Sequence, residues 1–182
     1  MGLISEMGKL EKIIDSAGVN RAIARISHEI LESNKGVENL AVVGVRSKGV
    51  VLAQLITEKI REIEKVEVPL GIIDITLYRD DLSVGTHHPA LGSTEIDFSI
   101  DDKNIVLVDD VLYTGRTVRA ALDALIDFGR PKTIKLAVLV DRGHRELPIR
   151  ADFVGKNIPT SRKDVIKARL ENELGVDILK SE

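Results

Sequence analysis

The sequence predicts an α/β protein whose central, mainly parallel sheet is flanked by helices. Short runs rich in Val, Ile and Leu alternate with amphipathic helical segments through most of the chain. A crossover helix between successive strands is the connection that parallel strands require. At 182 residues, with 43% apolar and 30% charged residues, the chain is expected to form a single domain spanning residues 1–182.

The first half of the chain shows two helical patterns, each followed by a strand pattern. Apolar residues recur at helical spacing from 19 to 31, with Ser16 as a possible N-cap and Gly36 as a stop. Residues 40–43 predict a buried strand, and the polar turn 44–49 separates it from an amphipathic helix at about 50–64. β-Branched and apolar residues then predict a strand over 68–78.

The second half continues the alternation after a long irregular stretch. Residues 80–103 carry little regular signal apart from a weak alternating patch near 95–100, which predicts a lid loop over about 80–103. A strand at 105–109, a helix at 115–127, a Gly-Arg-Pro stop at 129–131 and a strand at 133–140 follow. From residue 151 onward, the pattern predicts short strands and a basic turn.

Composition excludes several classes of protein. The chain has no cysteine, which excludes disulfides and thiolate metal sites. No apolar run is long enough to span a membrane, and the first residues lack the features of a signal peptide, so we expect a cytoplasmic protein with no membrane partner. The net charge is −3, yet residues 142–169 hold eight Lys or Arg against three acids.

The segment Ile105–Thr117 is the most informative part of the chain. An apolar strand ends in Asp109 and Asp110, and the turn Thr114-Gly115-Arg116-Thr117 leads into a helix. Two adjacent carboxylates alone would more simply cap a turn. Joined to a turn whose glycine, hydroxyls and amides can surround an anion, they suit a ribose carrying a phosphate.

This segment resembles the signature of type I phosphoribosyltransferases, which bind 5-phosphoribosyl diphosphate (PRPP). The wider chain, over roughly residues 20–170, resembles the PyrR family through residues 75–82, 106–120, 138–150 and 155–160. Members of that family are bifunctional pyrimidine operon attenuators with uracil phosphoribosyltransferase activity. The resemblance implies the type I phosphoribosyltransferase fold, with a flexible lid loop and a small hood made of the N-terminal segment and residues 151–182.

The resemblance also implies the catalytic and substrate-binding residues. Asp109 and Asp110 would hold the ribose hydroxyls, near a Mg²⁺ that arrives with PRPP rather than in a dedicated protein site. Arg142 would contact the substrate, and Ile166 would belong to a hood that recognises the pyrimidine. The implied substrate-binding set is Arg46, Ser47, Lys48, Gly49, Arg79, Asp109, Asp110, Val111, Leu112, Tyr113, Thr114, Gly115, Arg116, Thr117, Arg142 and Ile166.

Within that set, residues 46–49 and Arg79 would bind the diphosphate, and residues 114–117 the 5′-phosphate. Two positions depart from common family patterns. Purine-using relatives carry Asp where this chain has Tyr113, and a tyrosine is not an ionised base near neutral pH. The substitution disfavours hypoxanthine and guanine and leaves a pyrimidine. Many members have Arg in place of Lys48, which keeps the charge but not the bidentate geometry.

A second surface implied by the resemblance is basic. The family binds a hairpin in pyrimidine operon leader mRNA when UMP or UTP is bound. The matching positions here are Arg25, His28, Arg145, Arg150 and Lys156. Ala24 stands where relatives often have Thr, and Ser33 where a basic residue is common, so RNA binding could be weakened while catalysis persists.

Three hypotheses remain open at this level. The first is a regulator that binds RNA in response to uridine nucleotides and makes UMP from uracil and PRPP. The second is a plain phosphoribosyltransferase for uracil or another pyrimidine, and the third is a non-catalytic nucleotide sensor. The resemblance implies a homodimer or higher homo-oligomer, and His87 and His88, with no third ligand nearby in sequence, are expected to be solvated.

Overall fold

The computed structural model describes residues 9–78 and 93–181, and within them the chain forms two sheets and three α-helices. The larger sheet is parallel throughout, with strand order β3-β2-β4-β5-β6. Its strands are β2 (Leu40–Val45), β3 (Leu70–Ile73), β4 (Asn104–Leu112), β5 (Thr133–Asp141) and β6 (Phe153–Asn157). The predicted α/β class with a mainly parallel sheet is confirmed.

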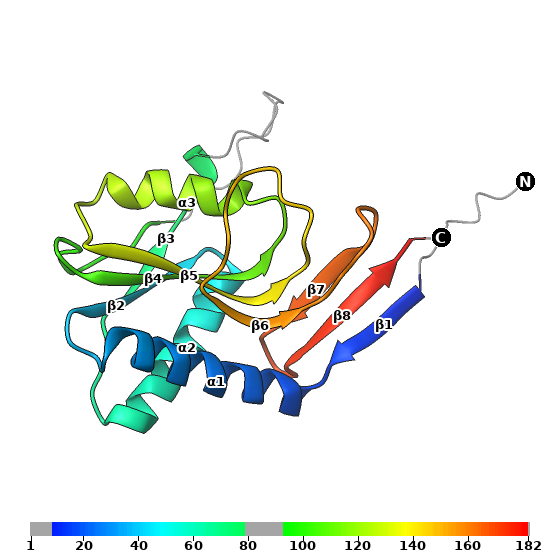
Figure 1. Ribbon diagram of the computed structural model, residues 1–182, viewed down its shortest axis with the longest axis horizontal. Coiled ribbons are helices and arrows are strands. Elements are labelled where there is room, and N and C mark those ends of the chain that lie inside the picture. The colour runs from blue at the N-terminus through cyan, green and yellow to red at the C-terminus, as the bar shows by residue number, and fades with distance from the viewer. Residues whose placement is uncertain (1–8, 79–92, 182) are drawn as a thin grey trace, which may run out of the picture.

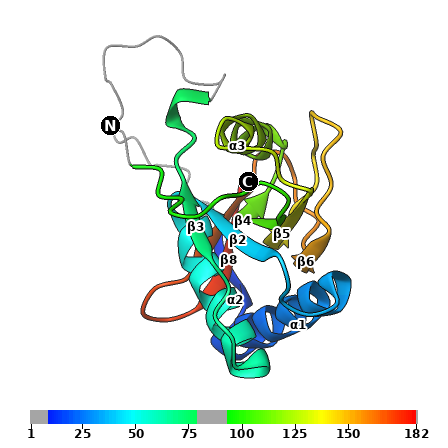
Figure 2. The same cartoon turned by 90° about the vertical axis from the view of Figure 1, so that its left-hand side faces the viewer.

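Helices cover both faces of this sheet, as Figures 1 and 2 show. The helices α1 (Ser16–Asn34) and α2 (Lys48–Glu64) lie on one face, and α3 (Arg116–Ile126) lies on the other. Alternate strand residues point into the two cores. Val42, Val106 and Val108 pack with α1 and α2. Val43 and Leu107 pack with α3. Parallel strands buried on both faces are therefore almost entirely apolar. None of the described helices is long and apolar enough to cross a membrane.

The helix boundaries correct the predicted N-cap of α1. Asp15, not Ser16, is the N-cap residue, and its carboxylate accepts a hydrogen bond of 2.7 Å from the Gly18 N–H. At the other end, Lys35 adopts a left-handed conformation, and the Gly36 N–H donates to the Leu31 carbonyl at 2.9 Å. The helix thus runs three residues further in each direction than residues 19–31.

Two strands differ in length from their predicted counterparts. The strand predicted over 68–78 is only Leu70–Ile73, because the chain turns into the short 3₁₀ helix η1 (Thr76–Tyr78). The strand predicted over 105–109 is longer, since β4 continues to Leu112 beside β5. Of the predicted lid, residues 80–92 lie outside the described residues. Residues 93–103 pack along β3, where Glu95 pairs with Ile72 and Ile100 is buried.

The tail divides between the two sheets. The strand β6 extends the parallel sheet, so residues 153–157 belong to it rather than to the predicted hood. The antiparallel second sheet has the order β1-β8-β7 and is made of β1 (Lys9–Ile14), β7 (Val165–Arg169) and β8 (Gly175–Lys180). Figure 1 shows it at one end of the molecule, beside β6 and the start of α1. Ile14, Ala168 and Val176 join it to the core under α1.

We expect Asp15→Ala to lower the free energy of unfolding by about 1 kcal/mol, because the Gly18 N–H loses its acceptor. For a domain of this size that loss corresponds to a fall in melting temperature of about 2–4 °C. Ser16→Ala is the matched control and should change stability little. Thermal unfolding followed by circular dichroism measures both, and equal effects of the two substitutions would contradict the assignment of the cap.

Candidate functional site

The site begins where β2 and β4 separate. These two strands pair only as far as Gly44 with Val108, whereas β4 continues to Leu112. The chain leaves β2 into α2 on one face of the sheet and leaves β4 into α3 on the other (Figure 1). A crevice therefore opens at the carboxyl ends of the strands, at the position where open α/β sheets bind their ligands.

A cleft of about 500 Å³ occupies this crevice. Three parts of the chain that are distant in sequence line it: the turn after β2, the turn after β3, and the end of β4 with the first turn of α3. The lining residues are Arg46, Ser47, Lys48, Asp74, Ile75, Thr76, Asp109, Asp110, Val111 and Thr117. Seven of these belong to the predicted substrate-binding set, so the structure brings together the predicted diphosphate loop, the carboxylate pair and the first turn of α3.

Asp109 and Asp110 line the same cleft although they are neighbours on a strand. Successive side chains of a strand normally point to opposite faces. Here the pairing of β2 with β4 ends before both residues, so the edge of β4 that bears them is open toward the cleft. Asp109 is buried, and its Oδ1 accepts a hydrogen bond of 2.9 Å from the Asp110 N–H, while Asp110 is half-buried.

The electrostatics of the pair favour a bound cation or hydroxyl donors. Burial first, and then the nearby charge of Asp110, raises the pKa of the Asp109 carboxyl well above its ordinary value. Two close carboxylates repel each other, and any group that donates hydrogen bonds or carries positive charge relieves that repulsion. Within the described residues, no group of three or more His, Asp or Glu side chains is arranged to hold a metal ion.

Two helix N-termini open onto this cleft. The helix α2 begins at Lys48, and its N-cap residue Ser47 makes no side-chain capping bond. The helix α3 begins at Arg116, and its N-cap Gly115 has a positive φ of 94° and no side chain to cap with. The N–H groups of a first helical turn and the positive end of the helix dipole favour anions, so both ends are anion sites. The arrangement suits a ligand with two separate phosphate groups.

Gly49 allows the diphosphate loop to approach β4. A Cβ at this position would lie 2.5 Å from the Val108 carbonyl oxygen and 3.1 Å from the Asp109 Cα. Both are backbone atoms of a central strand and cannot move aside. The glycine of the sequence pattern is thus required by packing that places residues 46–49 beside the carboxylate pair.

Arg46 reaches away from the strand ends toward residues 93–95, in the second part of the predicted lid. Its Nη2 donates to the Ser93 carbonyl at 2.7 Å and lies 3.2 Å from Oε1 of Glu95. The neighbouring Asp74 accepts from the Thr76 N–H and hydroxyl, and its own N–H donates to the Thr94 hydroxyl. The cleft wall after β3 is therefore tied to residues 93–95.

We call residues 113–117 the phosphate loop. Its first residue, Tyr113, forms a stacked pair with Arg142. The guanidinium carbon of Arg142 lies 4.0 Å from the centre of the Tyr113 ring. Arg142 is only 6% exposed, and it donates to the Thr160 hydroxyl at 3.2 Å and to the Ser161 carbonyl at 2.9 Å. Arg142 thus links the phosphate loop to the turn that precedes β7.

The remaining predicted substrate residues lie in several environments. The Leu112 side chain is buried in the core under α3, so only its backbone is available to a ligand. Ile166 lies on β7 opposite Ile178 and packs partly against the core. Arg116 forms an ion pair with Glu146, at 2.8 Å. Arg79, His87 and His88 lie outside the described residues.

The predicted RNA-binding residues fall into two groups. Arg25 and His28 are exposed on α1, and Arg25 donates to the Val154 and Gly155 carbonyls at 3.0 and 2.6 Å, which places it next to Lys156 on β6. A groove of about 510 Å³ at the start of α1 is lined by Lys156 together with Lys12 and Arg21, two cations that the resemblance does not identify. Exposed cations gathered around one groove suit a phosphate backbone.

Arg145 and Arg150 form the second group, in the connection between β5 and β6. Arg150 is exposed, whereas the Arg145 side chain is 23% exposed and its guanidinium binds protein groups, including the Asp141 carboxylate and the Tyr113 carbonyl. The structure therefore places Arg145 against the phosphate loop.

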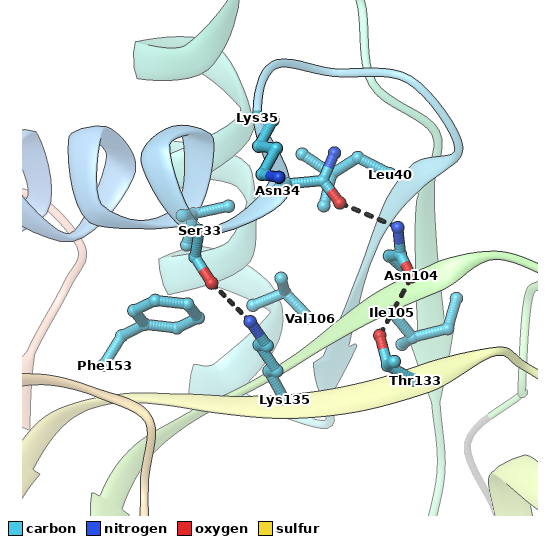
Figure 3. A pocket seen from close by; sticks show the side chains of 11 residues that line it. Ser33, Asn34, Lys35, Leu40, Asn104, Ile105, Val106, Thr133, Lys135 and Phe153 are labelled. Atoms are coloured by element: carbon cyan, nitrogen blue, oxygen red, sulfur yellow. Dashed lines mark hydrogen bonds between the residues drawn. The ribbon is translucent and has the colours of Figure 1, made fainter.

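Figure 3 shows a separate small pocket of about 180 Å³ at the opposite, amino-terminal edge of the sheet. Its polar side chains bind one another. The Asn104 amide nitrogen donates to Asn34 Oδ1 at 2.9 Å, and the Thr133 hydroxyl donates to Asn104 Oδ1 at 3.0 Å. Lys135 donates to the Ser33 hydroxyl and lies over the Phe153 ring. The ammonium group of Lys135, on β5, therefore lies beside Ser33.

Asp74, Ile75 and Thr76 are the cleft residues that sequence reasoning missed. The strand predicted over 68–78 covers them, which hid the turn at Asp74. These residues could have been predicted from their position directly after a strand that neighbours β2. The carboxyl ends of all strands in a parallel sheet lie at the same edge, where the cleft opens.

The buried carboxylate predicts a pH-dependent stability. Asp109→Asn should raise the melting temperature of the ligand-free protein at pH 7, because Asn keeps the acceptor for the Asp110 N–H and carries no buried charge. Since the folded pKa of Asp109 is raised, the folded protein binds more protons than the unfolded chain above about pH 4, and its stability falls as the pH rises.

The difference in melting temperature between the variant and the parent protein should therefore grow from about pH 4 to pH 7. Thermal denaturation in the presence of a chelator measures it. A difference that stays constant over this range would show that Asp109 is not the group responsible.

Comparison with known proteins agrees with this geometry. The family model described as "Phosphoribosyl transferase domain" matches residues 10–170. Bifunctional protein PyrR of Caldicellulosiruptor bescii is 65% identical over 160 residues, with 88% of each chain covered. Bifunctional protein PyrR of Deinococcus radiodurans is 59% identical over 167 residues, covering 92% of this chain and 91% of that one.

Solved structures show the same fold at low identity. The hypoxanthine phosphoribosyltransferase of Trypanosoma cruzi, in a ternary substrates complex, has a TM-score of 0.73 at 20% identity and covers 96% of this chain and 97% of its own. A hypoxanthine-guanine phosphoribosyltransferase of Bacillus anthracis has a TM-score of 0.63 at 21% identity, with 85% of each chain covered. The fold, the cleft and the curated relatives lead to one conclusion: this chain is a phosphoribosyltransferase and belongs to the PyrR family.

Proposed function

We propose that this protein is a uridine-nucleotide-dependent RNA-binding regulator of pyrimidine biosynthesis genes that also converts uracil and PRPP to UMP and diphosphate. The observation that carries the proposal is the cleft between β2 and β4. There, a carboxylate pair lies between two uncapped helix N-termini. PRPP is a ribose with phosphate groups at both ends, and this arrangement is complementary to it.

In the transfer reaction, each part of the cleft has a separate task. Asp109 and Asp110 hold the ribose hydroxyls and stabilise positive charge that develops on the sugar ring as diphosphate leaves. Residues 114–117 bind the 5′-phosphate through backbone amides and hydroxyls. Arg46, Ser47, Lys48 and Gly49 bind the departing diphosphate, and Arg79 is assigned to the same group.

Mg²⁺ fits this site as a companion of the substrate. The donor set at the cleft contains the carboxylates of Asp109 and Asp110, which are hard oxygen ligands of the kind that Mg²⁺ prefers. Mg²⁺ usually keeps several waters and binds through one or two carboxylates together with substrate phosphates. When bound, it neutralises the diphosphate leaving group. Asp109 then faces positive charge, which favours its ionised form.

The base is a pyrimidine. Tyr113 holds the place of the purine enzymes' aspartate, and its ring is covered by the Arg142 guanidinium. A tyrosine at this position lacks the carboxylate that the purine enzymes place there. Arg142 follows β5, stacks on Tyr113 and donates to the turn before β7, which supports its assignment to substrate recognition. Ile166, on β7, is assigned to pyrimidine recognition from the resemblance to the family.

The RNA hairpin is assigned to the exposed basic residues on α1 and β6. Arg25, His28 and Lys156 lie on neighbouring elements, and the groove beside Lys156 adds Lys12 and Arg21. A local patch is enough for a hairpin, because its loop bases are read individually while cations contact the backbone. Arg150 extends the surface along the connection into β6. We assign the protein to the cytoplasm and to a homodimer or larger homo-oligomer.

For the catalytic role, we expect Asp110→Asn to lower kcat/KM for PRPP by about 10- to 150-fold. This corresponds to the loss of a hydrogen bond to a charged group, worth about 1.5–3 kcal/mol. Diphosphate release from uracil, PRPP and Mg²⁺ measures it. Asp102→Asn removes the same charge from an exposed turn at the opposite edge of the sheet and should leave the rate unchanged. Equal rates for the parent protein and Asp110→Asn would show that Asp110 has no catalytic role.

For the regulatory role, we expect Lys156→Gln to weaken binding of pyrimidine operon leader RNA in the presence of UMP. Each phosphate contact contributes about 0.9 to the slope of log affinity against log salt concentration, so the slope should fall by about one. Lys132→Gln, which removes a charge from the connection between α3 and β5, should leave the slope unchanged.

The same assay separates the proposed function from a plain transferase. Parent protein that releases diphosphate but binds no leader RNA with UMP present, at any salt concentration, is a phosphoribosyltransferase without the regulatory role. Protein that binds RNA and UMP but turns over no substrate is a nucleotide sensor without catalysis.

A further inference from the structure

Lys135 is a cation on β5 whose side chain faces α1. Ala137, two residues further along the strand, packs in the core under α1 and α2, and the side chains of a strand alternate between its faces. Lys135 therefore points to the same face, near the amino-terminal end of the strand. There its ammonium group donates to the Ser33 hydroxyl in the last turn of α1 and lies 6.0 Å from the centre of the Phe153 ring (Figure 3).

These contacts hold the ammonium group in place without neutralising its charge. Within the described part of the chain, its partners are the Ser33 hydroxyl and the Phe153 ring, and neither carries a charge. The helix α1 has no basic residue in its own last turn, so Lys135 supplies the cation that the negative end of the helix dipole favours. An ammonium group has three N–H donors, and the hydroxyl accepts one of them. The others are available to an external acceptor.

The ammonium group continues the basic surface that we assign to RNA. The ring beside it belongs to Phe153, the first residue of β6. The carbonyl groups of residues 154–155 accept the hydrogen bonds from Arg25, and Lys156 follows directly. The three cations therefore lie beside successive residues of one edge strand. From the first residue of β6 to Lys156, the strand spans about 10 Å.

The helix α1 carries the same surface along its length. Arg21 lines the groove at the start of the helix, Arg25 lies one turn later, and Ser33 lies in the last turn. The helix rises by about 18 Å from Arg21 to Ser33. Glu29, four residues before Ser33, is already paired with Arg25 at 2.8 Å. With Lys135 included, cations follow α1 from its first turns to its last.

From this placement we propose that Lys135 is an RNA contact, and that its ammonium group binds a backbone phosphate of the leader hairpin at the end of the surface opposite to Lys156. Phosphates recur every few ångströms along a strand of nucleic acid, so a surface of this length meets several of them. A lysine binds phosphate as a point charge. Position 33 of α1 then needs no cation of its own, because β5 supplies one beside it. This proposal rests on the RNA-binding part of the proposed function.

The test measures binding of leader RNA at saturating UMP over a salt series, for the parent protein and Lys135→Gln. Each phosphate contact contributes about 0.7–0.9 to the slope of log affinity against log salt concentration, so the slope should fall by that amount. At 0.1 M salt this is a loss of affinity of about 5- to 8-fold. Lys132→Gln is the matched control and should keep the slope, because Lys132 lines a separate cleft with Ile126, at the end of α3.

Returning the cation to the helix tests its position directly. When Ser33→Lys is combined with Lys135→Gln, the ammonium group reaches the same place from α1, and we expect the slope of the parent protein. Ser33→Glu instead places a carboxylate beside Lys135 and should lower the slope as much as Lys135→Gln does. Because Ser33→Glu leaves Lys135 in place, it decides the question even if Lys135→Gln unfolds.

The cleft provides an independent readout. Lys135 lines the pocket at the amino-terminal edge of the sheet, and the cleft opens at the carboxyl edge. The kcat, the KM for PRPP and the Kd for UMP should therefore be the same in Lys135→Gln as in the parent protein. Lys135→Arg keeps the charge and should keep the slope. A lower melting temperature of Lys135→Gln with an unchanged slope would show that Lys135 only stabilises the end of α1, which would overturn the RNA contact.

The outcomes separate this proposal from the proposed function. Parent protein that binds no leader RNA at any salt concentration overturns the regulatory role, and the RNA contact with it. Parent protein that binds RNA with the same slope as Lys135→Gln overturns the contact alone. A combined Ser33→Lys and Lys135→Gln variant that keeps the lowered slope also overturns it, since charge at this place would then not be the cause.

Discussion

The early end of the pairing between β2 and β4 is the constraint on which the rest of the site depends. Beyond Val108, β4 pairs with no described strand on the β2 side, although it keeps β5 on the other. Because the two crossovers leave on opposite faces, the helices that follow β2 and β4 both begin at this gap. The difference between the ends of β2 and β4 therefore brings two adjacent carboxylates and two anion-binding helix ends into a single cleft.

Two sets of contacts define the sides of this gap. One is a close backbone contact with β4, and the other is a set of hydrogen bonds to the phosphate loop. Gly49 lets the turn after β2 lie against β4. On the far side, the phosphate loop is supported from outside the cleft by the connection between β5 and β6, through hydrogen bonds to the Thr114 carbonyl. The parallel sheet provides the rigid frame, and the loops at its carboxyl edge are oriented by contacts with each other.

The two proposed activities share parts of this frame. The strand β6 carries Lys156 on the basic surface, and the connection that leads into it carries Arg150 and the residues packed on the phosphate loop. A nucleotide bound at the phosphate loop would thus be one short segment away from the proposed RNA-binding surface. Such proximity offers a physical route for UMP to influence RNA affinity, because ordering the phosphate loop also orders the chain that enters β6.

Sequence reasoning recovered the elements whose signals are local. The helical periodicity of residues 19–31 and 115–127, and the apolar runs before Asp109 and after Gly129, correspond to observed helices and strands. Local signals failed where a boundary depends on neighbours. The apolar run 68–78 has strand composition throughout, yet the chain stops pairing at Ile73, where β2 ends too. The cap of α1 was misplaced by one residue because Asp15 and Ser16 are both good caps.

What the sequence by itself determined is the chemistry of the site: two carboxylates, a glycine-containing turn suited to an anion, a basic turn after a strand, and a tyrosine that disfavours a purine base. These are properties of residue types at short spacing, and the backbone cannot alter them. Only the tertiary structure decided which side chains are available to ligands. It buried Leu112, tied Arg46 to Glu95, and directed the guanidinium of Arg145 into the protein. The reason is that a charged side chain binds whichever partner the fold brings nearest, and partners such as Glu95 for Arg46 and Tyr113 for Arg145 lie tens of residues away in sequence.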